Sequence, residues 1–158
     1  MTSQPSIPDI ERELDAIHVR ARQWFLESNI DSYLSLFNPG VSYRQVDGRV
    51  VGLASLSRSL RRQFRSLSAA DWKFTRESLT MQNGNAVEVL LLSGWFATVA
   101  FGFIHRVWRL ARRGRYTWIK QESGWQIVHV EIESETVQPV GFQFGSRVQL
   151  PPQTTGAA

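Results

Sequence analysis

The sequence of 158 residues contains no cysteine. A chain without thiols cannot form a disulfide framework, a thiolate metal site or a cysteine nucleophile, and it fits a reducing cytoplasm, where we expect this protein. Long apolar runs are missing too, because the stretch 97–104 is too short to span a membrane and leads into His105 and Arg106. The first residues carry neither the basic nor the apolar part of a signal peptide, and we expect no membrane contact.

Lysine is scarce: Lys73 and Lys120 are the only two, so arginine supplies nearly all of the positive charge behind a net charge of +4. The arginines are densest over 106–115, where they alternate with Trp108 and adjoin Tyr116. Such a pattern binds single-stranded nucleic acid, or it steers an anionic substrate towards a pocket. Because the excess of positive charge is small, we predict no nucleic-acid partner.

The usual signatures of metal and nucleotide chemistry are also missing. The chain has no glycine-rich phosphate loop and no nucleophile elbow. The three histidines, His18, His105 and His129, are far apart in sequence and follow no ligand spacing. We therefore predict neither a metal nor a cofactor. His18 borders an apolar helix face and is interpreted as a helix-border residue and not a ligand. His105 stands among arginines, where we expect an exposed residue, the alternative being a lid residue over the mouth of a pocket.

Helical periodicity marks the first half of the chain. Apolar residues recur every three or four positions from Ile10 to Trp24, which predicts a helix that Ser6 caps. A short helix over 31–37, a turn at 38–40, a strand over 41–46 and a helix over about 53–67 are predicted next, listed in chain order.

The second half is rich in strands. Asn83 and Gly84 predict a hairpin turn between strands over 72–81 and 86–100, while 101–113 follows no clear period. Because strands and helices are segregated, we predict an α+β fold with a mostly antiparallel sheet. We expect one domain over 9–137, a disordered tail over 1–8, and a partly disordered extension over 138–158 that could add an edge strand at 140–144.

The segment 113–132 predicts a long β-hairpin around Gly124. On its second strand the side chains of Ile127, His129 and Glu131 share one face by simple alternation. An imidazole and a carboxylate stand there where a buried strand should be apolar, so His129 and Glu131 are our first candidates for an acid–base pair.

Three stretches of this sequence resemble the NTF2-like superfamily, in particular its SnoaL-like and ketosteroid-isomerase-like branches. They are 24–37 (WFLESNIDSYLSLF), 43–52 (YRQVDGRVVG) and 113–134 (RGRYTWIKQESGWQIVHVEIES). The resemblance implies a cone in which a curved sheet wraps around a long N-terminal helix and forms a deep pocket. It also implies a homodimer packed through the outer face of the sheet, and outward-facing Val128, Val130 and Ile132 would agree with that.

The resemblance can be carried onto single positions. At the position that holds the general base in ketosteroid isomerases, this sequence has Gln45. At the positions of their two oxyanion donors, it has Ala21 and Tyr116. An amide cannot abstract a proton and Ala21 cannot donate a hydrogen bond, so steroid isomerisation by that mechanism is not predicted. The pocket that the resemblance implies includes further positions: Tyr43, Ala21, Trp24, Gln45, Trp118 and Ile127.

We therefore predict a small-molecule-binding protein. The favoured activity is that of an acid–base lyase, isomerase or cyclase on a largely apolar carbonyl-type substrate. His129 and Glu131 would be the bases, and Tyr43 and Tyr116 the hydrogen-bond donors. The alternative is a non-catalytic hub or accessory protein of the same fold that binds a peptide or an anionic ligand.

Overall fold

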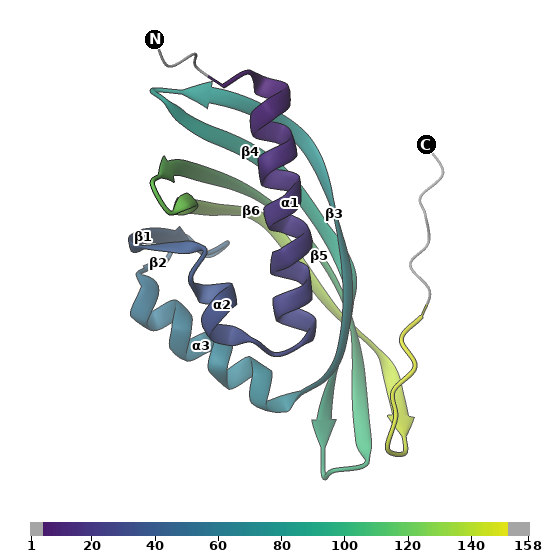
Figure 1. The fold of residues 1–158 in the computed structure, drawn as a ribbon. Coiled ribbons are helices and arrows are strands. Elements are labelled where there is room, and N and C mark those ends of the chain that lie inside the picture. Colours follow the sequence, from purple (N-terminus) through teal and green to yellow (C-terminus); the bar gives the residue numbers. More distant parts are fainter. Residues whose placement is uncertain (1–4, 152–158) are drawn as a thin grey trace.

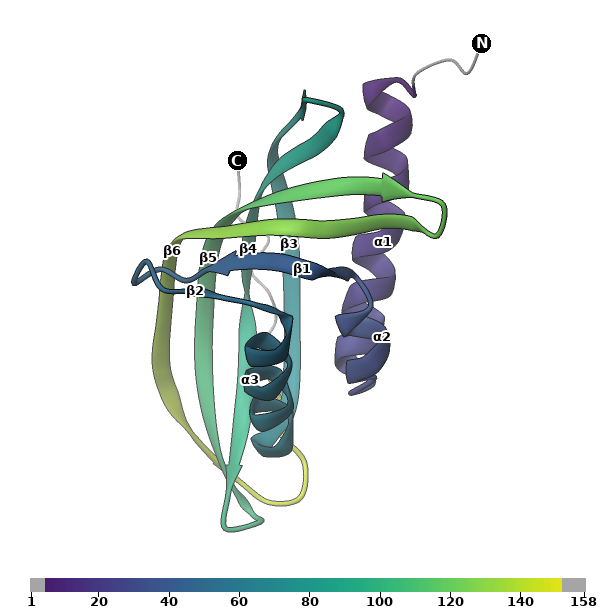
Figure 2. The same ribbon diagram turned by 90° about the vertical axis from the view of Figure 1, so that its left-hand side faces the viewer.

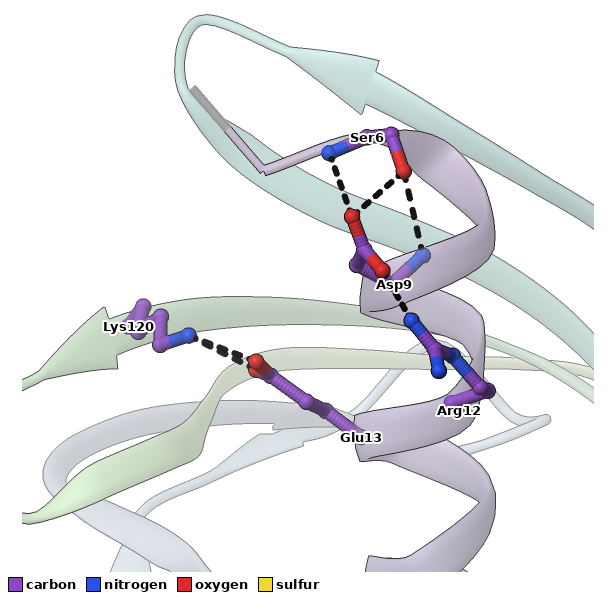
Figure 3. A network of polar contacts seen from close by, with 5 residues as sticks. All are labelled: Ser6, Asp9, Arg12, Glu13 and Lys120. Carbon is purple, nitrogen blue, oxygen red and sulfur yellow. Dashed lines mark hydrogen bonds and ion pairs between the residues drawn. The ribbon is translucent and has the colours of Figure 1, made fainter. Parts of the chain in front are cut away.

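A long helix, α1 (Ile7–Leu26), opens the part of the chain that the computed structural model describes, residues 5–151. Its N-terminus is a capping box: the Asp9 amide donates to Ser6 Oγ at 3.4 Å, and the Ser6 amide donates to Asp9 Oδ2 at 3.3 Å (Figure 3). The predicted helix and its cap are confirmed. Ile7 and Pro8 belong to this helix and not to a tail, and residues 1–4 lie outside the described part.

Two short helices and two short strands follow: α2 (Ile30–Leu34), β1 (Phe37–Arg44), β2 (Val50–Val51) and α3 (Leu53–Ser66). Asn29, not Asp31, caps α2, because the Asn29 side chain accepts from the Ser32 amide at 3.3 Å. The turn predicted at 38–40 is instead the irregular start of β1, where the register against the last strand shifts between Phe37 and Ser42. Pro39 offers no amide for regular pairing there.

Four long strands build the rest of the sheet: β3 (Leu67–Gln82), β4 (Asn85–Ala100), β5 (Ile104–Gln121) and β6 (Gly124–Phe144). The strand order is β2-β1-β6-β5-β4-β3, and every pair is antiparallel except β1 with β6. Asn83 and Gly84 form the predicted turn with positive φ angles of 51° and 81°. The unassigned stretch 101–113 is a turn followed by the first half of β5.

The sheet curves around α1, and α3 lies on the same side of it (Figures 1 and 2). The predicted α+β cone with a mostly antiparallel sheet is therefore confirmed. Its core joins one face of α1 to the concave side of the sheet. Trp118, Ile10, Leu14 and Val130 are among its fully enclosed side chains. None of the helices in residues 5–151 is long and apolar enough to cross a membrane.

β6 is the longest strand, and it passes through the domain boundary expected after residue 137. Residues 140–144 are its last part and not a separate edge strand, since Phe144 still pairs with Ile104 of β5. The Gly145 amide then donates to the Phe103 carbonyl at 2.9 Å. The extension over 138–158, which we expected to be partly disordered, is thus strand up to residue 144, and 152–158 lie outside the described residues.

Three β-bulges interrupt the pairing of β6 with β5. Thr117 pairs with His129 but Trp118 pairs with Ile127, which leaves Val128 as an extra residue. The same happens at Glu133 and at Val140. Each extra residue bends the strand and reverses the alternation of its side chains. The bulges therefore decide which β6 residues face the cone.

Candidate functional site

A cavity of about 540 Å³ lies between the three helices and the concave face of the sheet. Its wall is largely aromatic and aliphatic: Phe25, Phe37, Phe74, Phe96, Leu92 and Leu110 contribute to it. The volume and the apolar lining match those of sites for small organic molecules. The chemistry of the cavity therefore depends on the few polar groups that interrupt this wall.

All three tyrosines of the sequence line the cavity, and each comes from a different element. Tyr33 stands on α2, Tyr43 on β1 and Tyr116 on β5. Within residues 5–151 no protein group forms a hydrogen bond with any of the three hydroxyls, and none of the three oxygens is a fully buried atom. The hydroxyls are thus open to the cavity, where a bound molecule can accept from them or donate to them.

The protein keeps these phenols neutral. Burial raises the pKa of Tyr33 to about 12, with a further contribution from nearby Tyr43. Burial also raises the pKa of Tyr43 and that of Tyr116, although Arg112 acts in the opposite direction on both. At neutral pH the cavity therefore presents three O–H donors in a poorly hydrated setting, where a hydrogen bond to a developing oxyanion is strong.

One cation stands among the tyrosines. Arg112 of β5 lines the cavity and donates from Nε to Glu135 Oε2 of β6 at 2.5 Å. Burial acts to lower the pKa of Arg112, but Tyr43, Tyr116 and Glu135 together raise it, so the guanidinium stays charged. Since Glu135 already neutralises this charge, the polar end of the cavity suits a neutral ligand oxygen better than a carboxylate.

A second polar centre lies where α1 meets β4. Glu88 of β4 is fully buried, and it accepts three hydrogen bonds: from His18 Nε2 at 2.7 Å, from Trp118 Nε1 at 2.8 Å and from Arg76 Nε at 2.9 Å. Burial acts to raise the pKa of Glu88, but His18 and Arg76 outweigh it and hold the pKa below its ordinary value. Glu88 is therefore an ionised carboxylate inside the protein.

This carboxylate fixes the chemistry of His18. An ionised carboxylate only accepts hydrogen bonds, so Nε2 of His18 carries the proton that is donated to Glu88. Nδ1 has no partner within the described residues, and His18 lines the cavity. The ring is held by Phe74, at a centroid distance of 4.8 Å, and by the edge of Trp118 at 5.8 Å. His18 is thus an oriented imidazole on the cavity wall, and its Nδ1 atom has no protein partner within the described residues.

The structure places most of the predicted pocket residues on the cavity wall. Tyr43, Tyr116, Ala21, Gln45, Trp118 and Ile127 all line it. Gln45 is engaged elsewhere, because its side-chain oxygen accepts from Arg49 at 2.7 Å. Trp24 does not line the cavity and packs against the core instead.

The structure does not bring His129 and Glu131 to the cavity. The bulge at Val128 turns Val130 and Ile132 inwards, where their side chains are 0% and 5% exposed, and this sends His129 and Glu131 to the opposite face. The prediction of an inward-facing acid–base pair on β6 is therefore wrong. The same shift places Val130 and Ile132 in the core, so they cannot contribute to an apolar outer face for dimerisation.

Four site residues were missed by reasoning from the sequence: His18, Tyr33, Glu88 and Arg112. A signal existed for Glu88, since it is the single charged residue in the apolar run 86–92, and an ionisable group in a buried strand needs a partner. No comparable signal marked His18. Within residues 5–151, no three His, Cys, Asp or Glu side chains come close enough to hold a metal ion.

Several solved structures have the same architecture at low sequence identity. A "putative aromatic ring hydroxylase" from Novosphingobium aromaticivorans is 16% identical, with a TM-score of 0.71 over 87% of this chain and 96% of that chain. A "putative scytalone dehydratase" from the same organism is 9% identical, with a TM-score of 0.67 over 94% and 95% of the two chains. Aln2 from a Streptomyces species is 15% identical, with a TM-score of 0.60 over 83% and 94%.

No protein-family model and no curated protein matches the sequence. The structural neighbours are proteins of the SnoaL/NTF2-like fold, and this chain has that fold, as its sequence predicted. At these identities the likeness establishes the fold alone. Any activity has to be argued from the cavity of this chain.

Proposed function

We propose that this chain, with its NTF2-like fold, binds a small, largely apolar molecule with a carbonyl-type oxygen and acts on it by acid–base chemistry. One observation carries the proposal: the cavity combines three tyrosine hydroxyls that lack protein partners with an imidazole that a buried carboxylate orients. The first group provides hydrogen-bond donors and the second provides a base. A lyase, isomerase or cyclase needs both.

Each residue has a definite role in this proposal. His18 Nδ1 takes a proton from the carbon next to the carbonyl, the electron pair of that C–H bond forms a C=C bond, and the π pair of the carbonyl moves onto its oxygen. Tyr43 and Tyr116 donate hydrogen bonds to the resulting enolate. Glu88 does not touch the substrate; it is a positioning residue that stabilises the imidazolium formed on His18. His18 then returns the proton, or a leaving group departs.

The solved neighbours are compatible with this class of activity. One of them carries the name of a scytalone dehydratase, and dehydration is a lyase reaction. The paired Arg112 and Glu135 favour a neutral ligand, which argues for a carbonyl compound over the anionic ligand or peptide of a non-catalytic accessory protein. The hub alternative gains no specific support from the cavity.

Proton abstraction can be tested without knowledge of the natural substrate. The probe is 2-tetralone, a bicyclic ketone small enough for the cavity, and the measurement is the exchange of its α-protons in deuterated buffer followed by NMR. We expect the protein to accelerate exchange beyond buffer, and His18→Asn to remove at least about 100-fold of that acceleration. Tyr116→Phe should reduce it about tenfold, since one of several donors is lost.

A matched control separates catalysis from binding. His18→Asn should still quench or shift tryptophan fluorescence on addition of 2-tetralone, because Trp118 lines the same cavity. Binding with no exchange in the unmodified protein would support a non-catalytic binder. The proposal is overturned altogether if the protein does not bind 2-tetralone and if mass spectrometry detects no small molecule that co-purifies with it.

A further inference from the structure

Four phenylalanines are exposed together at one end of the sheet. Phe101 is 88% and Phe103 is 58% exposed in the turn between β4 and β5, while Phe142 and Phe144 at the end of β6 are 62% and 72% exposed. The ends of β4, β5 and β6 extend beyond α3 at this end of the molecule (Figures 1 and 2). We call these four residues the aromatic tip. Exposed aromatic side chains gathered in this way mark an interaction surface.

Several bonds hold the aromatic tip in a fixed shape. Ile104 pairs with Phe144, and the Gly145 amide donates to the Phe103 carbonyl at 2.9 Å. His105, which is 5% exposed, bonds through Nε2 to the Gly145 carbonyl at 2.9 Å and through Nδ1 to Ser68 Oγ at 2.8 Å. The tip is therefore an ordered surface in which the ends of β5 and β6 are hydrogen-bonded to each other and to β3.

The charge around the aromatic tip has one sign. The sequence has no Asp or Glu between residues 89 and 121, and none after 135. Arg106 lies 4.3 Å from the ring centre of Trp108 and 5.7 Å from that of Phe142, and Arg147 is exposed just beyond β6. Four exposed phenylalanines together with Arg106 and Arg147, on strand ends that carry no Asp or Glu, match an anionic lipid surface, because apolar rings enter the interface while guanidinium groups meet lipid phosphates.

Two observations argue against a second copy of the chain as the partner. A self-complementary contact would bring Arg106 and Arg147 of both copies together with no carboxylate to offset them. The free edge of β6 would be the natural place for strand pairing, but Pro139 and the bulge at Val140 interrupt it. Although the sequence alone predicts no membrane contact, we therefore propose that the aromatic tip docks this protein onto anionic lipid membranes.

The tip is also continuous with the cavity. Phe96 and Thr98 line the cavity, and Trp108 lies beside Phe96 with its ring inclined by only 9° at a centroid distance of 6.0 Å. Trp108 Nε1 donates to Thr98 Oγ1 at 3.1 Å, which fixes the indole. An aromatic strip thus leads from the cavity towards Phe142. Docking through the tip would place this strip next to the membrane, although the docking itself does not depend on the proposed reaction.

Sedimentation of the full chain with lipid vesicles tests the proposal. We expect binding to vesicles of phosphatidylcholine with a quarter phosphatidylglycerol, and at least about tenfold weaker binding to pure phosphatidylcholine. Replacing Phe101 and Phe103 by serine should weaken binding about 100-fold, at about tenfold per inserted ring. The control is Val19→Ser on α1, a 69% exposed apolar residue outside the tip, which should bind like the unmodified protein.

A separate variant tests whether the arginines of the tip are needed for the preference for anionic lipid. Arg106→Gln with Arg147→Gln should remove most of the preference for anionic vesicles. The proposal is overturned if the unmodified protein does not sediment with anionic vesicles, or if the two phenylalanine substitutions leave binding unchanged. It is also overturned if those substitutions instead convert an oligomer into a monomer, as measured by light scattering, since the tip would then be a contact between copies.

Discussion

His18 Nε2 lies 2.7 Å from Glu88 Oε1, although the two residues are 70 positions apart in the chain. Glu88 is fully enclosed, and Arg76 connects it to the surface, where the Arg76 guanidinium also meets Asp15 at 2.7 Å. The carboxylate is thus stabilised from α1, β3 and β5 at once. A group held in this way should affect stability as well as function, and the two effects can be measured separately.

Loss of the negative charge at position 88 should destabilise the fold. Glu88→Gln keeps the shape of the side chain but leaves Arg76 without its buried partner, so we expect the free energy of unfolding to fall by about 3 kcal/mol. Urea denaturation followed by tryptophan fluorescence measures this. Glu122→Gln in the exposed turn between β5 and β6 is the matched control, and it should change stability by less than about 0.5 kcal/mol. Equal effects of the two variants would contradict a paired, ionised Glu88.

The same carboxylate makes stability dependent on acid. The pKa of Glu88 in the folded protein lies below its ordinary value of 4.5, because His18 and Arg76 outweigh the effect of burial. A depressed pKa gives stabilisation that is complete above the unfolded value and is lost as the pH falls through the folded value. The stability difference between the unmodified protein and Glu88→Gln should therefore be constant above about pH 5 and shrink below pH 4.5. A difference that grows in acid would refute this sign.

Alkaline titration should report on the cavity directly, since all three tyrosines line it. The ordinary phenol pKa is 10.0, but burial raises the pKa of Tyr43 and Tyr116 and brings that of Tyr33 to about 12. The near-ultraviolet absorbance of tyrosinate should show no folded tyrosine that titrates at 10. A raised pKa stabilises the fold below pH 10 and loses that effect as the pH rises further, so alkali should unfold the chain. In guanidinium all three should titrate near 10.

Local signals predicted most of the fold. Ser6 with Asp9 marked the first helix, and Asn83 with Gly84 marked a hairpin, because a cap and a tight turn depend only on neighbouring residues. Both predictions are confirmed. The region 101–113 was not assigned because the Gly102 turn leads directly into a strand whose arginines occupy both even and odd positions, so apolar and polar residues do not alternate.

The site could not be predicted in the same way. Simple alternation placed His129 and Glu131 inwards, but Val128 resembles any other strand residue and nothing local marks it as a bulge. His18 and Glu88 meet only when α1 packs across the sheet, so neither residue reveals the other in sequence. The resemblance to a cone correctly placed Tyr43 and Tyr116 at a cavity because it carries the tertiary arrangement that periodicity lacks.

The reversed face of β6 predicts a clear pattern of mutational effects. Val130→Ala should lower the free energy of unfolding by about 2 kcal/mol, because a fully buried side chain leaves a cavity. His129→Ala and Glu131→Ala should each cost less than about 0.5 kcal/mol, and neither should change the affinity for 2-tetralone. Urea denaturation and fluorescence titration measure the two quantities. If His129→Ala lost affinity for 2-tetralone and Val130→Ala left the free energy of unfolding unchanged, His129 and not Val130 would face the cavity.

Gly114 should control the position of Tyr116. A Cβ atom at Gly114 would lie 3.0 Å from Tyr116 Cε2 and 3.2 Å from Ile132 Cδ1, which is closer than side chains normally approach. Gly114→Ala must therefore displace the Tyr116 ring or the core residue behind it, at a cost of about 1–3 kcal/mol in the free energy of unfolding. Gly141→Ala is the matched control, because its Cβ would meet no atom within 4 Å.

Gly114→Ala should also weaken the binding of 2-tetralone. Adding Tyr116→Phe to Gly114→Ala should reduce the affinity little further, because Gly114→Ala has already moved the Tyr116 hydroxyl out of place. Fully additive losses would show that Gly114 and Tyr116 act independently.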